Sequence, residues 1–270
     1  MPVLEQTAEA NAAMVKQTAF NLSTNDPTSA EIIVDKVPMS GEFNMAMDAA
    51  LLELGAGRNV SVIRIYRWST PTVSVGYFQG SSGQTASPFL SVPTVRRLSG
   101  GGAILHDAEL TYSCVLPATH NLRKNPSELY EVIHSRLIQL LSGCGITCML
   151  RQTFKSENNP NNTMGIAAEP FLCFLRSNPN DIVDSSGAKI VGSAQRRRKG
   201  ITLQHGSILL STSTLMPTIL GIRQLCPRFD AQRFQNELPA AIGESVSTRW
   251  EFRDYDREEL EIAGGFLKNP

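Results

Sequence analysis

The sequence predicts an α+β fold in which helices flank a mixed, mostly antiparallel sheet. Most runs with strand character follow one another without a helix between them, and this order favours antiparallel pairing. The chain contains no internal repeat and no second region with its own composition, and its 270 residues can bury a sizeable core. We expect a flexible arm over residues 1–30, one domain over 31–250 and a helical tail over 251–270.

The first half of the chain is expected to hold one helix followed by five strands. The stretch "GEFNMAMDAALLELG" places Met45, Asp48 and Leu52 at helical spacing, and Gly55 is a helix stop signal. A loop is expected at 79–88, where Gly and Ser cluster. Strands are predicted where β-branched and aromatic residues gather, at 61–68, 72–78, 93–98, 103–106 and 110–116.

The second half begins with the clearest helical pattern, "NPSELYEVIHSRLIQLLSGCG". Pro126 suits a first helical turn, Leu129, Ile133 and Leu137 form an apolar stripe, and Gly143 favours termination. Several turn formers predict a loop at "SENNPNNTMG". Short strands are then expected at 171–175, 181–183, 188–195 and 201–210, and helices at 231–241 and 256–267.

Composition excludes several classes of function. The formal net charge is zero and the pI is about 6.9, which argues against a nucleic-acid partner. No apolar run approaches the roughly 20 residues of a membrane span, and no secretory signal is visible. Five scattered cysteines fit a reducing, cytoplasmic location. Cys144 and Cys148 lack a second Cys/His pair at zinc spacing, so no metal site is expected and both are predicted to be core residues.

The stretch "VRRLSGGGAILHD" contains three consecutive glycines beside a predicted strand. A tight turn between strands would explain them, and so would a backbone that passes close to a ligand. Arg96 and Arg97 alternate on a strand, so one of them can point into a cleft beside the glycines. The spacing fits neither the dinucleotide fingerprint nor a P-loop. Exposed backbone N–H groups at such a turn attract anions and carbonyl oxygens.

A second unusual stretch is "KIVGSAQRRRKGITLQHGSILL". Lys189 opens a strand of small residues, which allow a ligand or a second backbone to approach closely. His205 and Gly206 lie on the next strand of an expected hairpin. The basic run at 196–199 is either a solvated turn or a docking patch, and the sequence leaves both open.

These two stretches, with "FNMAMDAALL" and "IRIYRWSTPTVSVGYFQ", resemble the biotin/lipoate protein ligase superfamily. The resemblance is closest to its cysteine-dependent protein octanoyltransferases, which are lipoate–protein ligase A-like, and it runs from Glu42 to Leu210. It implies a catalytic domain like that of class II aminoacyl-tRNA synthetases and biotin ligases. The implied reaction moves an octanoyl group from octanoyl-acyl carrier protein, through a cysteine thioester, to a protein lysine. The implied acceptors are the glycine-cleavage H protein or lipoyl domains of 2-oxoacid dehydrogenases, and no cofactor is implied.

The resemblance also implies which residues form the site. Cys173, in "FLCFL", precedes Lys189 at nearly the family's spacing, and these two are the implied catalytic residues. Without the resemblance, Cys173 would be interpreted as a small core residue of an apolar strand. An ammonium about 4 Å from the sulfur would favour the reactive thiolate. The implied substrate-binding residues are Arg97, Ser99, Gly100, Gly101, Gly102, His106, Gly192, Ser193, Ala194, His205 and Gly206.

The four histidines are not equivalent in this interpretation. His106 is expected to support the glycine turn and His205 to lie near the acyl carbonyl. His120 and His134 lie outside the motifs and are expected to be surface or helix residues.

Two alternatives to octanoyl transfer stay open. One is an ATP-dependent lipoate–protein ligase, which would use ATP and Mg. The other is a non-enzymatic lipoyl-binding module on the same fold. The presence of both Cys173 and Lys189 favours an enzyme.

Overall fold

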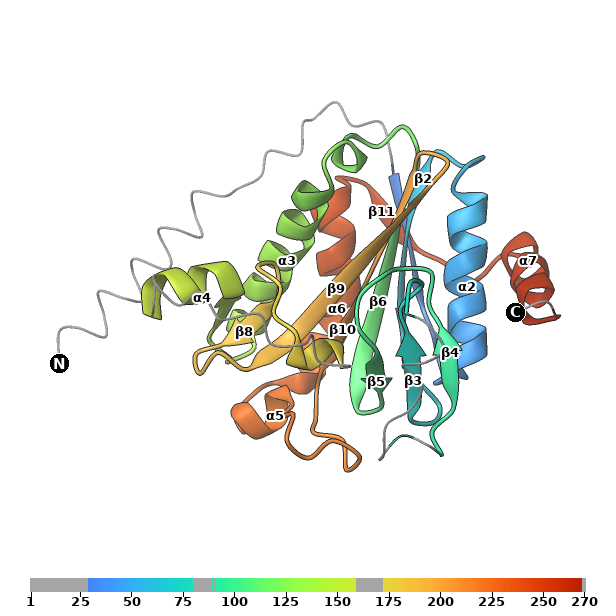
Figure 1. The fold of residues 1–270 in the computed structure, drawn as a ribbon. Helices are drawn as coiled ribbons and strands as arrows, with labels where there is room; N and C mark the ends of the chain where they lie inside the picture. The colour runs from blue at the N-terminus through green and yellow to red at the C-terminus, as the bar shows by residue number, and fades with distance from the viewer. Residues whose placement is uncertain (1–28, 80–88, 90, 159–171, 269–270) are drawn as a thin grey trace.

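The computed structural model describes residues 29–79, 89, 91–158 and 172–268. Its centre is an eight-stranded sheet in the order β11-β1-β2-β6-β10-β9-β8-β7 (Figure 1). Strand β1 pairs in parallel with β2 and β11, whereas the other neighbouring pairs are antiparallel, so the predicted mixed, mostly antiparallel sheet is confirmed. The strands are β1 (Ser29–Val34), β2 (Val60–Tyr66), β6 (Glu109–Leu116), β7 (Cys148–Leu150), β8 (Ile182–Asp184), β9 (Lys189–Arg198), β10 (Ile201–Leu209) and β11 (Trp250–Phe252).

Helices cover both faces of this sheet (Figure 1). Helices α3 (Pro126–Gly143) and α6 (Ala231–Val246) bury their apolar stripes against one face and form the largest hydrophobic core. Helix α2 (Gly41–Leu54) packs on the other face through Leu51 and Leu52. Each of these helices has apolar residues at helical spacing on one side. Burial of that side determines how the helix lies against the sheet.

The remaining helices are short or peripheral. Helix α7 (Arg257–Lys268) packs on α2, and α4 (Arg151–Asn158) and α5 (Ile222–Leu225) follow β7 and β10 along the chain. The 3-10 turn η2 (Asn121–Arg123) precedes α3. No helix in the described part of the chain is long and apolar enough to cross a membrane.

A second, three-stranded sheet lies next to β6, between that strand and α2 in the view of Figure 1. Its central strand β3 (Thr72–Val75) pairs in parallel with β4 (Thr94–Arg96) and antiparallel with β5 (Ile104–His106). The triple glycine connects β4 to β5. This small sheet therefore positions the glycine turn against the main sheet.

Most predicted elements are confirmed, and one is wrong. Residue 171 of the strand expected at 171–175 lies outside the described residues, and 172–175 are not a strand: Leu172 makes a single bridge with Ala103, and Cys173–Leu175 form a 3-10 turn, η3. Leu172 packs into a core cluster, whereas Leu175 is exposed. The apolar residues of this stretch therefore do not form one face of a strand. The elements not expected from the sequence are strands β1, β7 and β11, helices α4 and α5, and the 3-10 turn η2. Helix α4 also extends over 156–158, where the start of a loop was expected.

The proposed division of the chain stays a prediction. Residues 1–28 of the expected arm lie outside the described residues, and Ser29 and Ala30 are the first residues of β1. Strand β11 spans the expected boundary at residue 250, and the tail contains α7 as anticipated. Most of the loops expected at 79–88 and 156–165 also lie outside the described residues.

Candidate active site

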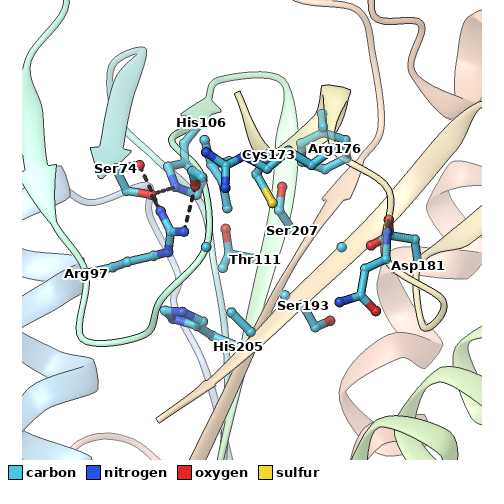
Figure 2. A pocket seen from close by; sticks show the side chains of 18 of the residues that line it. Ser74, Arg97, His106, Thr111, Cys173, Arg176, Asp181, Ser193, His205 and Ser207 are labelled. Carbon is cyan, nitrogen blue, oxygen red and sulfur yellow. Dashed lines mark hydrogen bonds between the residues drawn. The ribbon is translucent and has the colours of Figure 1, made fainter. Parts of the chain in front are cut away.

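A cavity of about 390 Å³ opens between the glycine turn, strands β9 and β10, and the η3 turn. Figure 2 shows Cys173 facing Ser193 and His205 across it, with Arg97 on one side and Asp181 on the other. Its volume lies within the usual range for small-molecule sites. Of the predicted site residues, the following line it: Arg97, Gly100, Gly101, Gly102, His106, Cys173, Lys189, Gly192, Ser193, Ala194, His205 and Gly206.

Cys173 and Lys189, predicted to act together, are neighbours in the cavity. Lys189 Nζ lies 3.9 Å from Cys173 Sγ and 3.2 Å from the Cys173 carbonyl oxygen. The backbone N–H of Cys173 donates to the carbonyl of Ala103 over 2.7 Å, directly after the glycine turn. This bond fixes the cysteine segment to the small sheet, while Lys189 enters from the main sheet.

Asp181 is a residue of the site that the sequence interpretation missed. Its carboxylate lies 2.9 Å from Lys189 Nζ, and both side chains are almost fully buried. The backbone N–H of Asn178 also donates to this carboxylate. A buried ammonium needs such a partner, because an unpaired buried charge is strongly destabilising. The sequence could have indicated Asp181 only through the predicted strands around it. Asp181 precedes β8 and Lys189 opens β9, and the antiparallel pairing of these two strands brings the two side chains close together.

Gly192 lines the cavity and also makes room for the side chain of Lys189. A Cβ placed on it would lie 2.6 Å from Cε and 3.0 Å from Nζ of Lys189. A Cβ on Gly206 would similarly overlap the side chains of Ser193 and Tyr112. Both glycines therefore accommodate neighbouring side chains of the site, and their expected contact with a ligand stays a prediction.

The glycine turn is wound around the guanidinium of Arg97. One Nη donates to the carbonyls of Gly100 and Gly102 over 2.7 Å each, and the other donates to the carbonyl of Ser74. Gly101 has a φ of +93°, which disfavours other residues. The run is therefore both a tight turn and a wall of the cavity. Arg96 points the opposite way, as the strand alternation predicted.

The Arg97 guanidinium is buried among neutral acceptors within the described residues. Burial lowers its pKa to about 10, although the nearby Cys173 thiolate would oppose this shift. At neutral pH, Arg97 therefore places a positive charge in the wall beside Cys173.

His106, which is expected to support the glycine turn, lines the cavity and contacts strands β3 and β6. Its Nδ1 lies 2.6 Å from a carboxylate oxygen of Glu109 and its Nε2 lies 2.7 Å from Ser74 Oγ. Its ring stacks on Trp68 with a centroid separation of 3.8 Å. Ser74 also accepts hydrogen bonds from Arg97, through its carbonyl oxygen and its hydroxyl. His106 and Arg97 therefore both hold strand β3 in place.

His205 makes an equivalent connection on the other side of the turn. It bonds Ser99 through Nε2 and lies 3.2 Å from Asp48 through Nδ1. Burial alone would raise the pKa of Asp48, but His205 and Arg64 together hold it below its usual value. Ser99 does not line the cavity, so this Ser-His-Asp chain anchors the turn and does not present a nucleophile. Ser99 thus departs from its predicted role as a substrate contact.

The sequence matches the lipoyl protein ligase A/B catalytic domain family over residues 40–241. The chain belongs to this family. Octanoyltransferase LipM of Brevibacillus brevis is 36% identical over 178 residues, which cover 64% of this chain and 63% of that protein. Octanoyltransferase LipM of Bacillus subtilis is 36% identical over 184 residues, covering 66% of this chain and 64% of that protein. The chain thus matches somewhat less than two thirds of the length of these relatives.

Solved structures agree on the fold of this lipoyl protein ligase A/B catalytic domain. The crystal structure of a lipoate-protein ligase A bound with ATP superposes with a TM-score of 0.67 and 18% identity, covering 89% of this chain and 95% of that one. A bi-partite lipoate protein ligase of Thermoplasma acidophilum superposes with a TM-score of 0.65 at 18% identity, covering 89% and 92%. The predicted ligase-like fold is therefore confirmed.

Other predictions about this catalytic domain had mixed outcomes. Cys144 and Cys148 are buried, as expected of core residues, and Cys114 is buried as well. Among the described residues no group of His, Cys, Asp and Glu is suited to a metal ion, and the expected lack of a metal site stays a prediction. His134 is a helix residue, one of the two expected alternatives, but it is buried on the side of α3 that faces the sheet. His120 is not a surface residue: it is buried at the N-cap of η2.

The first three residues of the basic run at 196–199 end strand β9, and Lys199 begins the two-residue turn to β10. Arg198 and Lys199 each lie 3.3 Å from a carboxylate oxygen of Glu53, and Arg196 stacks over the ring of Tyr77. These contacts are compatible both with a solvated turn and with a docking patch, and a docking role stays a prediction.

Proposed function

We propose that this chain is a protein octanoyltransferase that carries the octanoyl group on Cys173. The observation that carries the proposal is the thiol of Cys173, held 3.9 Å from the ammonium of Lys189 inside a cavity of suitable size. The names of its relatives support the same reaction. The proposed donor is octanoyl-acyl carrier protein, and the proposed acceptor is a lysine of a lipoyl domain or of the glycine-cleavage H protein.

The first half-reaction is a thioester exchange. The Cys173 thiol gives up its proton, and the thiolate attacks the octanoyl carbonyl. A new C–S bond forms, the donor C–S bond breaks, and the departing donor thiolate takes up the proton that Cys173 lost. Lys189 favours the thiolate through its charge, and Asp181 holds Lys189 in place. Arg97 adds a second positive charge near the carbonyl oxygen, where negative charge develops in the transition state.

The second half-reaction is an aminolysis. The neutral lysine amine attacks the acyl carbon of the Cys173 thioester, a C–N bond forms, and the C–S bond breaks. The Cys173 thiolate leaves and takes up the proton that the amine loses. Both steps exchange one acyl bond for another, so we propose that neither ATP nor a cofactor takes part. A free thiol as nucleophile also suits the cytoplasm, which is the proposed location.

Transfer without ATP tests this proposal against the ligase alternative. Octanoyl-acyl carrier protein and a lipoyl domain are incubated with the protein in the presence of EDTA, and the mass of the lipoyl domain is measured. We expect octanoylation of the domain by the wild type and by Cys226→Ser, but none by Cys173→Ser. Cys226 is the matched control because it is also partly exposed but does not line the cavity. Octanoylation only with free octanoate, ATP and Mg would support the ligase, and no modification under either condition would favour a binding module.

A further inference from the structure

The Ser193 hydroxyl lies in the cavity wall and is hydrogen-bonded to two other side chains. Ser193 lies on β9, four residues after Lys189, and lines the cavity floor (Figure 2). Its Oγ lies 2.7 Å from His134 Nε2 and 2.7 Å from the hydroxyl of Tyr112. The directions of these two hydrogen bonds decide what the hydroxyl can do for a substrate.

The bond between Ser193 and His134 has one possible direction when His134 is neutral. His134 Nδ1 lies 2.6 Å from the carbonyl oxygen of Asn180, which can only accept, so Nδ1 carries the ring hydrogen. Burial lowers the pKa of His134 to about 4, outweighing the Asn180 carbonyl, which raises it, and Lys189 lowers it further. At neutral pH, Nε2 is therefore an acceptor, and the Ser193 hydroxyl donates to it.

The direction of the hydrogen bond between Ser193 and Tyr112 follows from the side-chain amides of Gln195 and Gln204. Gln195 Nε2 donates to the carbonyl of Pro126 and to Gln204 Oε1. The amide nitrogen of Gln204 then faces Tyr112 and donates to its hydroxyl over 2.9 Å. The Tyr112 hydroxyl lies 3.5 Å from His134 Nε2 but only 2.7 Å from Ser193 Oγ, and Nε2 already accepts from Ser193. Tyr112 therefore donates its only hydrogen to Ser193.

Ser193 consequently acts toward the cavity as an acceptor only. Its hydrogen is committed to His134 and one lone pair to Tyr112, which leaves a single lone pair for a substrate. Such a group attracts an N–H donor and disfavours a carbonyl or carboxylate oxygen. Among the groups that meet at Cys173 during transfer, the acyl carbonyl and the sulfur accept, and the amine donates.

We propose that Ser193 accepts a hydrogen bond from the attacking lysine amine, and that His134 is a positioning residue that keeps this lone pair facing the cavity. The inference rests on the proposed function and deepens it, because it assigns a residue to the second half-reaction alone. Ser193 keeps its own hydrogen throughout. The proton lost by the amine goes to the departing Cys173 thiolate, as described above.

Separate measurement of the two half-reactions tests the proposal. Acylation of Cys173 by octanoyl-acyl carrier protein is followed by rapid quench and intact mass, and the isolated octanoyl-enzyme is then mixed with a lipoyl domain. We expect Ser193→Ala to slow aminolysis about ten-fold or more and to change acylation less than about two-fold. Ser245→Ala is the matched control, because this buried serine donates to the carbonyl of Ile242 and does not line the cavity. It should leave both rates unchanged.

A double-mutant cycle tests the part assigned to His134. His134→Leu frees the Ser193 hydroxyl to rotate, so it should slow aminolysis less than Ser193→Ala does. In the Ser193→Ala background it should add no further loss, because the group it orients is gone. Independent, multiplying losses would overturn the positioning role.

The remaining outcomes separate this proposal from its alternatives. A lower melting temperature of Ser193→Ala with both rates unchanged would show a purely structural network and overturn the proposal. The N–H donor could instead be an amide of the donor's thiol arm. In that case Ser193→Ala would slow acylation by octanoyl-N-acetylcysteamine but not by octanoyl-mercaptoethanol, and the assignment to the amine would be wrong. If the wild type forms no octanoyl-enzyme, the proposed function itself fails, and this inference with it.

Discussion

The ammonium of Lys189 lies 3.9 Å from the sulfur of Cys173, and the carboxylate of Asp181 lies 2.9 Å from the same ammonium. The lysine thus stands between a nucleophile that it can activate and a carboxylate that holds it. Removing the lysine removes the charge next to the sulfur, whereas displacing it leaves the charge and spoils the geometry. These two changes should have different effects.

Replacement of Lys189 by Met should slow alkylation of Cys173 by iodoacetamide at pH 7 by about ten-fold and shift the rate profile to higher pH. The positive charge that favours the thiolate is lost, and a ten-fold effect corresponds to about 1.4 kcal/mol. Rates against pH, in a Cys226→Ser background, check this. Lys189→Arg keeps the charge but not the shape, so it should preserve alkylation better than octanoyl transfer. Superimposable profiles for all three proteins would mean that another group activates the thiol.

Displacement of the lysine is tested at Gly192. Gly192→Ala places a methyl group 2.6 Å from Lys189 Cε, so the lysine must move away from its site. Octanoyl transfer should fall about ten- to a hundred-fold, because small misplacements in a site are costly. Gly57→Ala is the control, because a Cβ there meets only a carbonyl at 4.0 Å. Steady-state transfer rates decide the matter, and unchanged transfer by Gly192→Ala would contradict the role of Lys189.

The glycine turn gives a stability prediction. Gly101→Ala should lower the free energy of unfolding by about 1–2 kcal/mol, because alanine is strained at a φ of +93° and its methyl would lie 3.1 Å from an Nη of Arg97. Gly100→Ala should cost clearly less, since its Cβ meets only Phe78 at an ordinary 3.6 Å. Urea denaturation of the two variants measures the difference. Equal losses would show that the conformation of Gly101 is not what requires glycine.

His134 should make the protein less stable in acid. Its pKa lies at about 4 in the folded state and near 6.5 in the unfolded chain, so the unfolded chain binds its proton first as the pH falls. The stability it contributes is complete above pH 6.5 and is lost progressively towards pH 4, by about 3 kcal/mol. Denaturation midpoints of the wild type and His134→Gln at pH 7 and pH 4.5 check this. The variant should show the shallower decline, and parallel declines would contradict the burial of a neutral imidazole.

Much of the site could be anticipated because its residues lie in two continuous stretches. The glycine turn with Arg97 and His106, and the β9–β10 hairpin with Lys189 and His205, carry their own local signals of small residues next to charged ones. Alternation along strands also predicted correctly that Arg96 and Arg97 point in opposite directions.

The remaining site residues carry no such local signal. Asp181 and His134 are single polar residues in ordinary surroundings, and only the packing of β8 and α3 against β9 brings them to Lys189 and Ser193. The apolar stretch around Cys173 has the composition of a strand, but one bridge to Ala103 is all the pairing it makes among the described residues. Its position against the cavity is set by tertiary contacts that composition does not encode.

The mass of the intact protein after incubation with octanoyl-acyl carrier protein tests the central claim most directly. Passage of the acyl group through Cys173 predicts one added octanoyl group, removable by hydroxylamine, in the wild type and in Cys226→Ser. Peptide mapping should place it on Cys173, and Cys173→Ser should gain no octanoyl group and transfer none to a lipoyl domain. Transfer by Cys173→Ser at the wild-type rate would contradict the covalent mechanism.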